Sequence, residues 1–304
     1  MNSGVSSSNN LNSVIKSFTE PNNLIMNFAF TLLVIIVFII LLQIGANIMG
    51  YFMAENGSPY LFNGTINAKQ MMYFEQDPKK DGNVSLLRSD NERGGMEFTW
   101  SFWINIEDME YNKGQYRHVF HKGEANIMTG NEYGKHTLEY KYESDEIDAL
   151  RELPSSKGLN FPNNAPGVYL HPNTNKMVIF MNTHKALMEK IEVDDFPMNK
   201  WVSVIIRCKG NVIDVYVNGV ISKRQVLKGV PKQNYGNLYT GMNGGFDGHL
   251  SNMRYFNYAV GTREIESIMS TGVNTINLSP KPGTYDDTNY LSASWFGLKS
   301  YGQV

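Results

Sequence analysis

The acidic residues are the first candidates for chemistry, because two carboxylates at the correct spacing can hydrolyse a glycosidic bond. The segment nearest to a spaced carboxylate pattern is EIDALRE, from Glu146 to Glu152. A retaining mechanism needs its two carboxyl groups about 5–5.5 Å apart. On a strand that rises about 3.3 Å per residue, Glu146 and Glu152 would be ~20 Å apart, and on a helix they would point to different sides. We interpret this segment as solvated loop charge and predict no catalytic residue.

Metal-ligating residue types also occur, but their spacing is poor for a shared ion. Asp194 and Asp195 are adjacent and precede Pro197, so they favour a turn. His118 and His121 are three residues apart on an expected strand, where side chains alternate, so they should face opposite sides. His184 and His249 are isolated in the sequence. We therefore predict no metal site and no cofactor.

Cys208 is the single cysteine of the chain, so no internal disulfide can form and no zinc site can be built on cysteines. It ends the apolar run from Trp201, which predicts a buried and inert thiol. The motifs Gly-x-Ser-x-Gly and His-Glu-x-x-His do not occur. The glycine-rich stretch 241–245 lacks a lysine and a following helix, so we expect a loop between strands and no enzyme.

The overall charge also excludes one class of partner. The 304 residues carry 27 basic and 29 acidic side chains, a formal net charge of −2, and no Lys/Arg run is longer than two. Proteins that bind nucleic acids usually show a basic patch or a strongly basic domain. Nucleic acid is therefore not an expected partner.

A charge-free segment near the start predicts a membrane anchor. Residues 24–44 contain no charged side chain, and the nearest charges are Glu20 and Glu55. About 20 apolar residues in a helix cover the ~30 Å hydrocarbon core of a bilayer. We expect a single-pass transmembrane helix in contact with lipid. Its central membrane-spanning residues would be Leu32, Ile36, Phe38 and Leu42.

A cleaved signal peptide is the alternative for this segment, although its apolar part is usually shorter and follows a basic start. The charges near the helix give only a slight preference for orientation. Lys16 precedes the helix and the next basic residue is Lys69, which mildly favours the large domain outside. In a secretory lumen, Asn63 and Asn83 would be glycosylation acceptors.

Beyond the anchor, the pattern changes to the two-residue alternation of strands. Phe98, Trp100, Phe102 and Ile104 share one face, which predicts a half-buried strand packed against a second sheet. Further strands are expected at 167–170, 177–181, 201–208 and 249–258. Residues 212–217 and 220–226 flank Asn218-Gly219, the sequence of a type I′ hairpin turn.

One helix is expected after the last strand. Thr262 would cap it, Glu264 would lie in its first turn, and Gly272 would follow its end. Residues 124–164 read as an insertion, either a functional loop or a disordered one. Trp295 and Phe296 suggest that the irregular C-terminal tail packs against something.

The ordered set of strand motifs resembles the concanavalin A-like lectin/glucanase superfamily, specifically its laminin-G-like branch. The matching motifs are FTWSFWI at 98–104, WVSVIIR at 201–207, VYVNG at 215–219 and GHLSNMRYFNYA at 248–259. The resemblance implies an all-β jelly-roll sandwich of two antiparallel sheets, preceded by the transmembrane helix. No carboxylate pair like that of the glucanases, and no calcium ligand set, can be matched to this chain.

The expected organisation follows from these segments. It comprises a polar tail (1–23), the transmembrane helix (24–44), a linker (45–59), the laminin-G-like domain (60–272) with its insertion (124–164), and a C-terminal tail (273–304). An anchored domain in an asparagine-rich, cysteine-poor chain also resembles proteins of large DNA viruses.

Two functions remain open at this level. The first is a structural role, in which the anchored domain docks onto other structural proteins, which would be capsid proteins in a virion. The second is the binding of a glycan or receptor by a loop group of Tyr235, Tyr239, Asn243 and Asp247. These four residues could instead only shape a glycine-rich connection.

Overall fold

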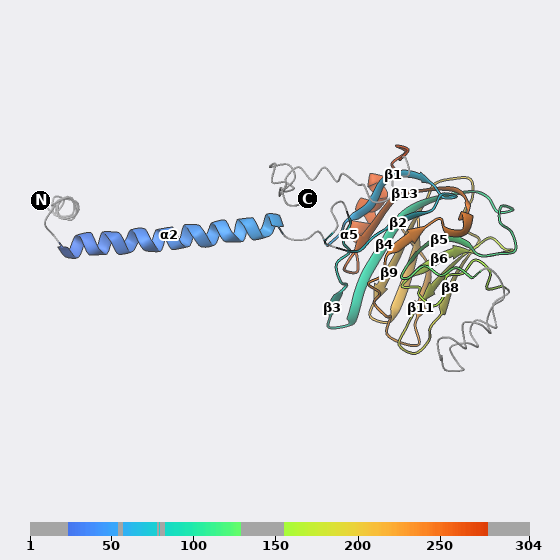
Figure 1. Ribbon diagram of the computed structural model, residues 1–304, viewed down its shortest axis with the longest axis horizontal. Coiled ribbons are helices and arrows are strands. Elements are labelled where there is room, and N and C mark those ends of the chain that lie inside the picture. Colours follow the sequence, from blue (N-terminus) through green and yellow to red (C-terminus); the bar gives the residue numbers. More distant parts are fainter. Residues whose placement is uncertain (1–23, 54–56, 78, 80–82, 129–154, 279–304) are drawn as a thin grey trace, which may run out of the picture. The chain divides into compact units, whose positions relative to one another are not determined.

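The computed structural model describes residues 24–53, 57–77, 79, 83–128 and 155–278. A long helix and a β-sandwich belong to two separate compact units, which are described one at a time (Figure 1). The acidic segment 146–152 and the aromatic residues Trp295 and Phe296 lie outside the described residues.

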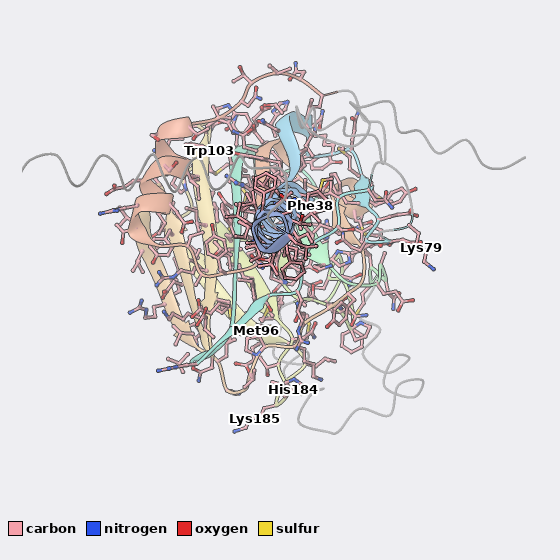
Figure 2. The ribbon with its side chains drawn as sticks, turned by 90° about the vertical axis from the view of Figure 1, so that its left-hand side faces the viewer. Phe38, Lys79, Met96, Trp103, His184 and Lys185 are labelled. Atoms are coloured by element: carbon pink, nitrogen blue, oxygen red, sulfur yellow. The ribbon has the colours of Figure 1, made fainter. Side chains whose placement is uncertain are left out.

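The helix, α2, runs from Leu24 to Met53 and is 30 residues long. Within it, residues 27–50 are long and apolar enough to cross a membrane, although a signal sequence near the N-terminus would also meet this criterion. The side chains expected at its centre are exposed, and Figure 2 shows Phe38 pointing outward from the helix axis. The helix does not end at residue 44 as predicted. It continues into the expected linker because residues 45–53 contain neither a charge nor a proline.

The sandwich consists of two antiparallel sheets, which confirms the predicted fold class. The β4 sheet has the order β1 (Tyr60–Asn67), β13 (Asp247–Phe256), β4 (Gly95–Asp108), β9 (Val202–Lys209), β10 (Val212–Val217) and β11 (Val220–Val226), with β3 (Asp90–Glu92) paired to β4. The β5 sheet has the order β2 (Met72–Phe74), β12 (Leu238–Thr240), β5 (Arg117–Lys122), β6 (Gly167–Leu170), β7 (Lys176–Met181) and β8 (Glu189–Asp194).

The main core lies between the two sheets. It contains the predicted inward face of β4, namely Phe98, Trp100, Phe102 and Ile104. The Trp100 ring lies 5.4 Å from the Phe120 ring of the β5 sheet and 4.8 Å from the Tyr255 ring, measured between centroids. These large aromatic side chains join the two layers, because each buries a large apolar area.

The opposite face of β4 is also buried, so the prediction of a half-buried strand is wrong. A second cluster covers this face of the sheet, with Ile205, Tyr216, Phe256, Val260 and Ile265 as its buried members. Ile265 belongs to α5 (Thr262–Thr271), which lies over this sheet (Figure 1). The strand alternation alone does not reveal this helix layer, because Thr99 and Ser101 are polar and yet buried.

Short local signals are mostly confirmed. Asn218 and Gly219 have φ values of 51° and 79°, as the predicted hairpin turn requires. In α5, however, the N-cap is Gly261, and Thr262 is the first helical residue. The Glu264 side chain accepts a hydrogen bond from the Gly261 N–H at 2.8 Å, which replaces the expected threonine cap.

The end of the predicted insertion is part of the fold. Leu159 and Phe161 are buried with Tyr116 and Tyr169 in a cluster on the outer face of the β5 sheet. Asn160 connects this segment to its surroundings, because its side-chain amide donates to the carbonyl groups of Glu124 and Asn163. Residues 155–164 are therefore a structural cover for that sheet, whereas residues 129–154 lie outside the described part of the chain.

Candidate functional site

A cavity of about 120 Å³ opens between the two sheets at one end of the sandwich. This is the end where β4 begins and where β5, β7 and β13 finish. Met96 lies toward this end in Figure 2, together with His184 and Lys185 of the connection between β7 and β8. The cavity is lined by Gln76, Leu86, Leu87, Ser89, Met96, Phe98, Trp100, Lys122, Ala165, Met181, Lys232, Gln233, Asn234, Tyr235 and Tyr255.

Two chain segments form the polar wall of this cavity. Gln76 holds the first segment, because its side chain accepts the Leu86 N–H at 3.0 Å and donates to the Val84 carbonyl at 3.1 Å. The second segment is residues 232–236, and Arg88 Nε donates to Gln233 Oε1 at 3.2 Å between the two. The wall is thus fixed by hydrogen bonds from both sides.

Lys122 is the principal charged group of the cavity. It ends strand β5 and is only 9 % exposed. Its Nζ donates to the Gly236 carbonyl at 2.7 Å. Burial disfavours the ammonium and lowers its pKa to about 8, and no Asp or Glu occurs among the described residues that line the cavity.

Ser89 is the second polar residue of the cavity with an unusual environment. It is 5 % exposed, and its hydroxyl is buried without a hydrogen-bond partner among the residues that the structure describes. Buried hydroxyl groups are normally paired, because an unpaired one costs about 1–3 kcal/mol. The hydroxyl is also not hydrogen-bonded to Lys122, so the two do not form a nucleophile and its base.

The four residues of the predicted loop group do not form one cluster. Tyr235 is 71 % exposed and lines the cavity before β12. Asn243 and Asp247 follow β12, and Asp247 pairs with Lys69 at 2.8 Å. Tyr239 lies within β12, where its ring stacks on that of His121 with centroids 5.2 Å apart. Their roles as ligand-binding residues stay predictions, and only Tyr235 lines the cavity.

The prediction that His118 and His121 face opposite sides is wrong. A bulge between His118 and Phe120 shifts the register of β5 against β6. An extra residue in one strand turns the following side chain to the other face. His118 Nε2 and His121 Nδ1 consequently lie 2.7 Å apart in a buried position.

Hydrogen bonds engage three of the four ring nitrogens of this pair, and His121 Nε2 is buried without a hydrogen-bond partner among the described residues. The Met242 N–H donates to His118 Nδ1 at 3.1 Å, so Nε2 carries the proton and donates to His121 Nδ1. Burial lowers the pKa of His121 to about 4 and lowers that of His118 well below its ordinary value. The pair is therefore neutral at physiological pH and is part of the packing beneath Tyr239.

The remaining candidate residues from the sequence do not line the cavity. Cys208 is fully buried, and burial raises the pKa of its thiol to about 12, so it is not a nucleophile. Asp194 ends strand β8 and pairs with Lys176, and the chain bends only at Asp195, which has a φ of 51°. His249 is not isolated, because its Nδ1 lies 3.0 Å from Glu107 Oε1 on the neighbouring strand. His184 lies in the connection after β7. Among the described residues, no group of three metal-ligating side chains occurs.

The expected glycosylation acceptors are both partly engaged. Asn63 is exposed on β1, and its side-chain oxygen accepts from Asn274 at 3.1 Å. The Thr65 hydroxyl of the same triplet donates to the Asn274 carbonyl at 2.7 Å. Asn83 donates to the Asp77 carbonyl at 3.1 Å. Glycosylation at either position stays a prediction.

Sequence reasoning missed Lys122 and Ser89. The one available signal was a lysine that ends the strand 117–122, next to aromatic and apolar residues. The lining residues are spread from 76 to 255 in the chain, so only the folded arrangement brings them together.

A known family model matches part of the sandwich. Residues 149–266 match the family model described as the concanavalin A-like lectin/glucanases superfamily. The match supports this superfamily. The search of curated proteins found no match.

Several solved structures are similar over part of the fold. The ligand-binding domain of botulinum neurotoxin serotype D, in complex with N-acetylneuraminic acid, is 14 % identical with a TM-score of 0.39, and the match covers 58 % of this chain and 36 % of that one. The binding domain of botulinum neurotoxin serotype G is 11 % identical with a TM-score of 0.40, and the match covers 68 % of this chain and 46 % of that one. The chain thus spans less than half of these solved chains, and the likeness carries no inference about ligands.

The buried ammonium gives a prediction about stability. At pH 7 we expect Lys122→Met to raise the free energy of unfolding by up to about 3 kcal/mol. The pKa falls from 10.5 to about 8 on folding, and each unit corresponds to about 1.4 kcal/mol. The unfolded chain binds more protons than the folded chain between these values, so the wild type gains stability as pH rises from 8 to 10.5. The higher free energy of unfolding of Lys122→Met relative to the wild type should therefore disappear above about pH 10.5.

Denaturant unfolding of the full chain in detergent micelles at pH 7 and pH 10.5 measures this difference. Loss of the hydrogen bond to Gly236 will reduce the gain in the variant. A variant that is less stable than the wild type at pH 7 would contradict a costly buried charge.

Proposed function

We propose that this chain is a non-enzymatic, membrane-anchored binding protein. In this proposal α2 crosses a membrane as a single-pass anchor, and the lectin-like sandwich binds a ligand at the cavity that contains Lys122. The partners would be the lipid bilayer on one side and a glycan, protein or small molecule on the other.

The observation that carries the binding role is the environment of Lys122. A buried ammonium is costly unless it is paired with an opposite charge. Here the acceptor described for Nζ is a neutral carbonyl, and the cavity is open to solvent. A titratable group with a strongly shifted pKa inside a cleft is a typical sign of a functional site. A ligand with complementary charge would relieve this cost.

Two observations support binding over catalysis. The Ser89 hydroxyl is not hydrogen-bonded to a base, and the described residues that line the cavity include no histidine or carboxylate. The hydrogen bond described for Lys122 Nζ goes to the Gly236 carbonyl, which cannot act as a general acid or base. The polar groups can hold a ligand in place but do not form an acid–base pair.

The membrane role is supported by the composition of α2. Its 30 residues contain no charged side chain, and a helix satisfies its backbone hydrogen bonds internally, as a bilayer requires. A virion role, in which the anchored domain joins a membrane to capsid proteins, stays a prediction from the sequence. The same holds for glycan binding through the predicted loop group of Tyr235, Tyr239, Asn243 and Asp247.

The binding role can be tested by placing a spin label at the mouth of the cavity. Because Cys208 is buried, Tyr235→Cys gives the full chain, held in lipid nanodiscs, one reactive thiol. A mixed panel of glycans, short peptides and small organic acids is then examined by ligand-observed NMR. We expect at least one saturable ligand whose signals are broadened by the label at residue 235.

A label at Val226→Cys is the matched control, because Val226 is 60 % exposed on the edge strand β11 and does not line the cavity. Broadening should be several-fold weaker with this control. Equal broadening from both positions, or no binding to the unlabelled wild-type chain by any class in the panel, would contradict the proposal.

A further inference from the structure

We infer that the cavity binds an apolar group that ends in a carboxylate, either as a free small acid or as the C-terminal residue of a peptide or protein. This inference rests on the proposed binding role and names the class of ligand for the same cavity. It combines three features of the lining: an apolar floor, a positive charge, and a buried hydroxyl without a partner.

The floor of the cavity selects for an apolar body. Phe98 and Trp100 of β4, Met181 of β7 and Tyr255 of β13 line it from both sheets. A volume of about 120 Å³ exceeds the room that a single water molecule needs. The cavity is therefore suited to a group of side-chain size, such as a branched aliphatic or a phenyl group.

The charge of the cavity selects for an anion. Lys122 and Lys232 both line it, and the described lining residues bring no negative charge. The Lys122 ammonium has three N–H donors, of which the structure assigns one to the Gly236 carbonyl. No other acceptor for Nζ is given among the described residues, so the remaining donors are available to a bound anion.

The buried hydroxyl favours a carboxylate as this acceptor. The Ser89 O–H is 5 % exposed and has no partner among the described residues. A carboxylate has about four acceptor positions on two oxygens, so it can accept from an ammonium and a hydroxyl together. Phosphate groups carry up to twice the charge and are typically bound by arginine forks or several backbone N–H groups. The described lining contains no arginine, and the buried donors are one ammonium and one hydroxyl, which fit the two oxygens of a carboxylate better.

Binding of an anion also predicts uptake of a proton. The other titratable side chains in the lining are Lys232, Tyr235 and Tyr255, so the protonation of Lys122 is set mainly by burial, which lowers its pKa to about 8. A bound carboxylate favours the ammonium and raises this pKa. The affinity should therefore be highest below pH 8 and fall as the pH rises above it.

The test uses the full chain in nanodiscs and matched pairs of acids and amides. The probes are 4-methylpentanoate and 3-phenylpropionate, the tripeptide Gly-Gly-Leu with a free C-terminus, and the amide of each. Titration calorimetry should show that the acids bind at least tenfold more tightly than the amides. At pH 8.5 the measured enthalpy should depend on the ionisation enthalpy of the buffer, which reports uptake of a proton.

Four variants separate the roles of the lining groups. Lys122→Met should weaken the acids at least tenfold and remove the uptake of a proton, whereas Lys122→Arg should keep most of the affinity. Ser89→Ala should weaken the acids a few-fold. The matched control is Lys113→Met, since Lys113 is exposed, pairs with Glu110 and does not line the cavity, and it should bind like the wild type.

The outcomes distinguish this inference from the proposed function. Equal affinity for acids and amides, or wild-type affinity in Lys122→Met, would overturn the carboxylate inference. If a ligand of another class were still broadened by the label at residue 235, the binding role would survive. Tight binding of inorganic phosphate in competition with the acids would also overturn the carboxylate inference. Binding of the free acids alone identifies a small molecule as the ligand, and binding of the peptide alone identifies a protein C-terminus.

Discussion

Arginine at both Ile36 and Phe38 should release the full-length chain from membranes. Each arginine at the centre of a transmembrane helix costs about 2.5–3.5 kcal/mol on insertion scales, so the pair costs ~5–7 kcal/mol. Both side chains lie near the middle of α2 and are exposed, so no described part of the protein would shield the new charges. Flotation of cell membranes on a density gradient measures the fraction of the chain that stays bound.

The control for this pair places the same charges near the end of the helix. Leu24→Arg with Asn27→Arg adds two arginines within the first turn of α2. Long basic side chains near a helix end can extend to the interface and remain hydrated. This control should float almost like the wild type. A double arginine variant at 36 and 38 that floats equally well would contradict a spanning helix.

Trp100→Ala should lower the free energy of unfolding of the sandwich by ~3–5 kcal/mol, the usual range for a buried aromatic side chain in a core. Trp100 is 1 % exposed and contacts the rings of Phe120 and Tyr255. Its removal would leave a cavity between the two sheets that these neighbours cannot fill without moving. Chemical unfolding of the full chain in micelles, followed by circular dichroism of the β-sheet signal, measures the loss.

Trp201→Ala is the matched control for this substitution. Trp201 is half-buried, and its ring lies 6.4 Å from that of His249, outside the core between the sheets. A smaller loss is expected, because less apolar area is removed from the interior. Equal losses for the two variants would show that Trp100 does not connect the sheets as the structure indicates.

The fold could be predicted where its signal is local. The alternation of Phe98, Trp100 and Phe102 identified the inward face of a central strand, because strand side chains point alternately to two sides. Asn218-Gly219 identified a hairpin, because both residues of its turn need positive φ. Both signals depend on neighbours in the sequence, and both are confirmed.

Predictions were wrong where tertiary structure changes a local rule. The bulge before Phe120 turned His121 toward His118, and nothing in the sequence of β5 marks this extra residue. The outer face of β4 was expected to be exposed, but α5 covers the sheet from a distant part of the chain. Such events depend on packing between segments that are far apart in sequence, which periodicity cannot report.

The candidate site was the least predictable part for the same reason. Tyr235 was predicted as a ligand-binding residue, but the other residues that line the cavity come from segments spread between residues 76 and 255. Lys122 looked like an ordinary lysine at the end of a strand until the fold placed it in the lining of a cavity with Trp100 and Ser89. Its burial, and the change in pKa that follows, is a property of the assembled sandwich alone.

The most direct measurement is alkaline extraction of membranes from cells that express the full chain, with the intact mass of the retained protein. We predict that the chain stays in the membrane pellet and that its mass includes α2. A chain in the supernatant with its first fifty residues intact would contradict the anchor, and a retained mass that lacks α2 would identify a cleaved signal sequence instead.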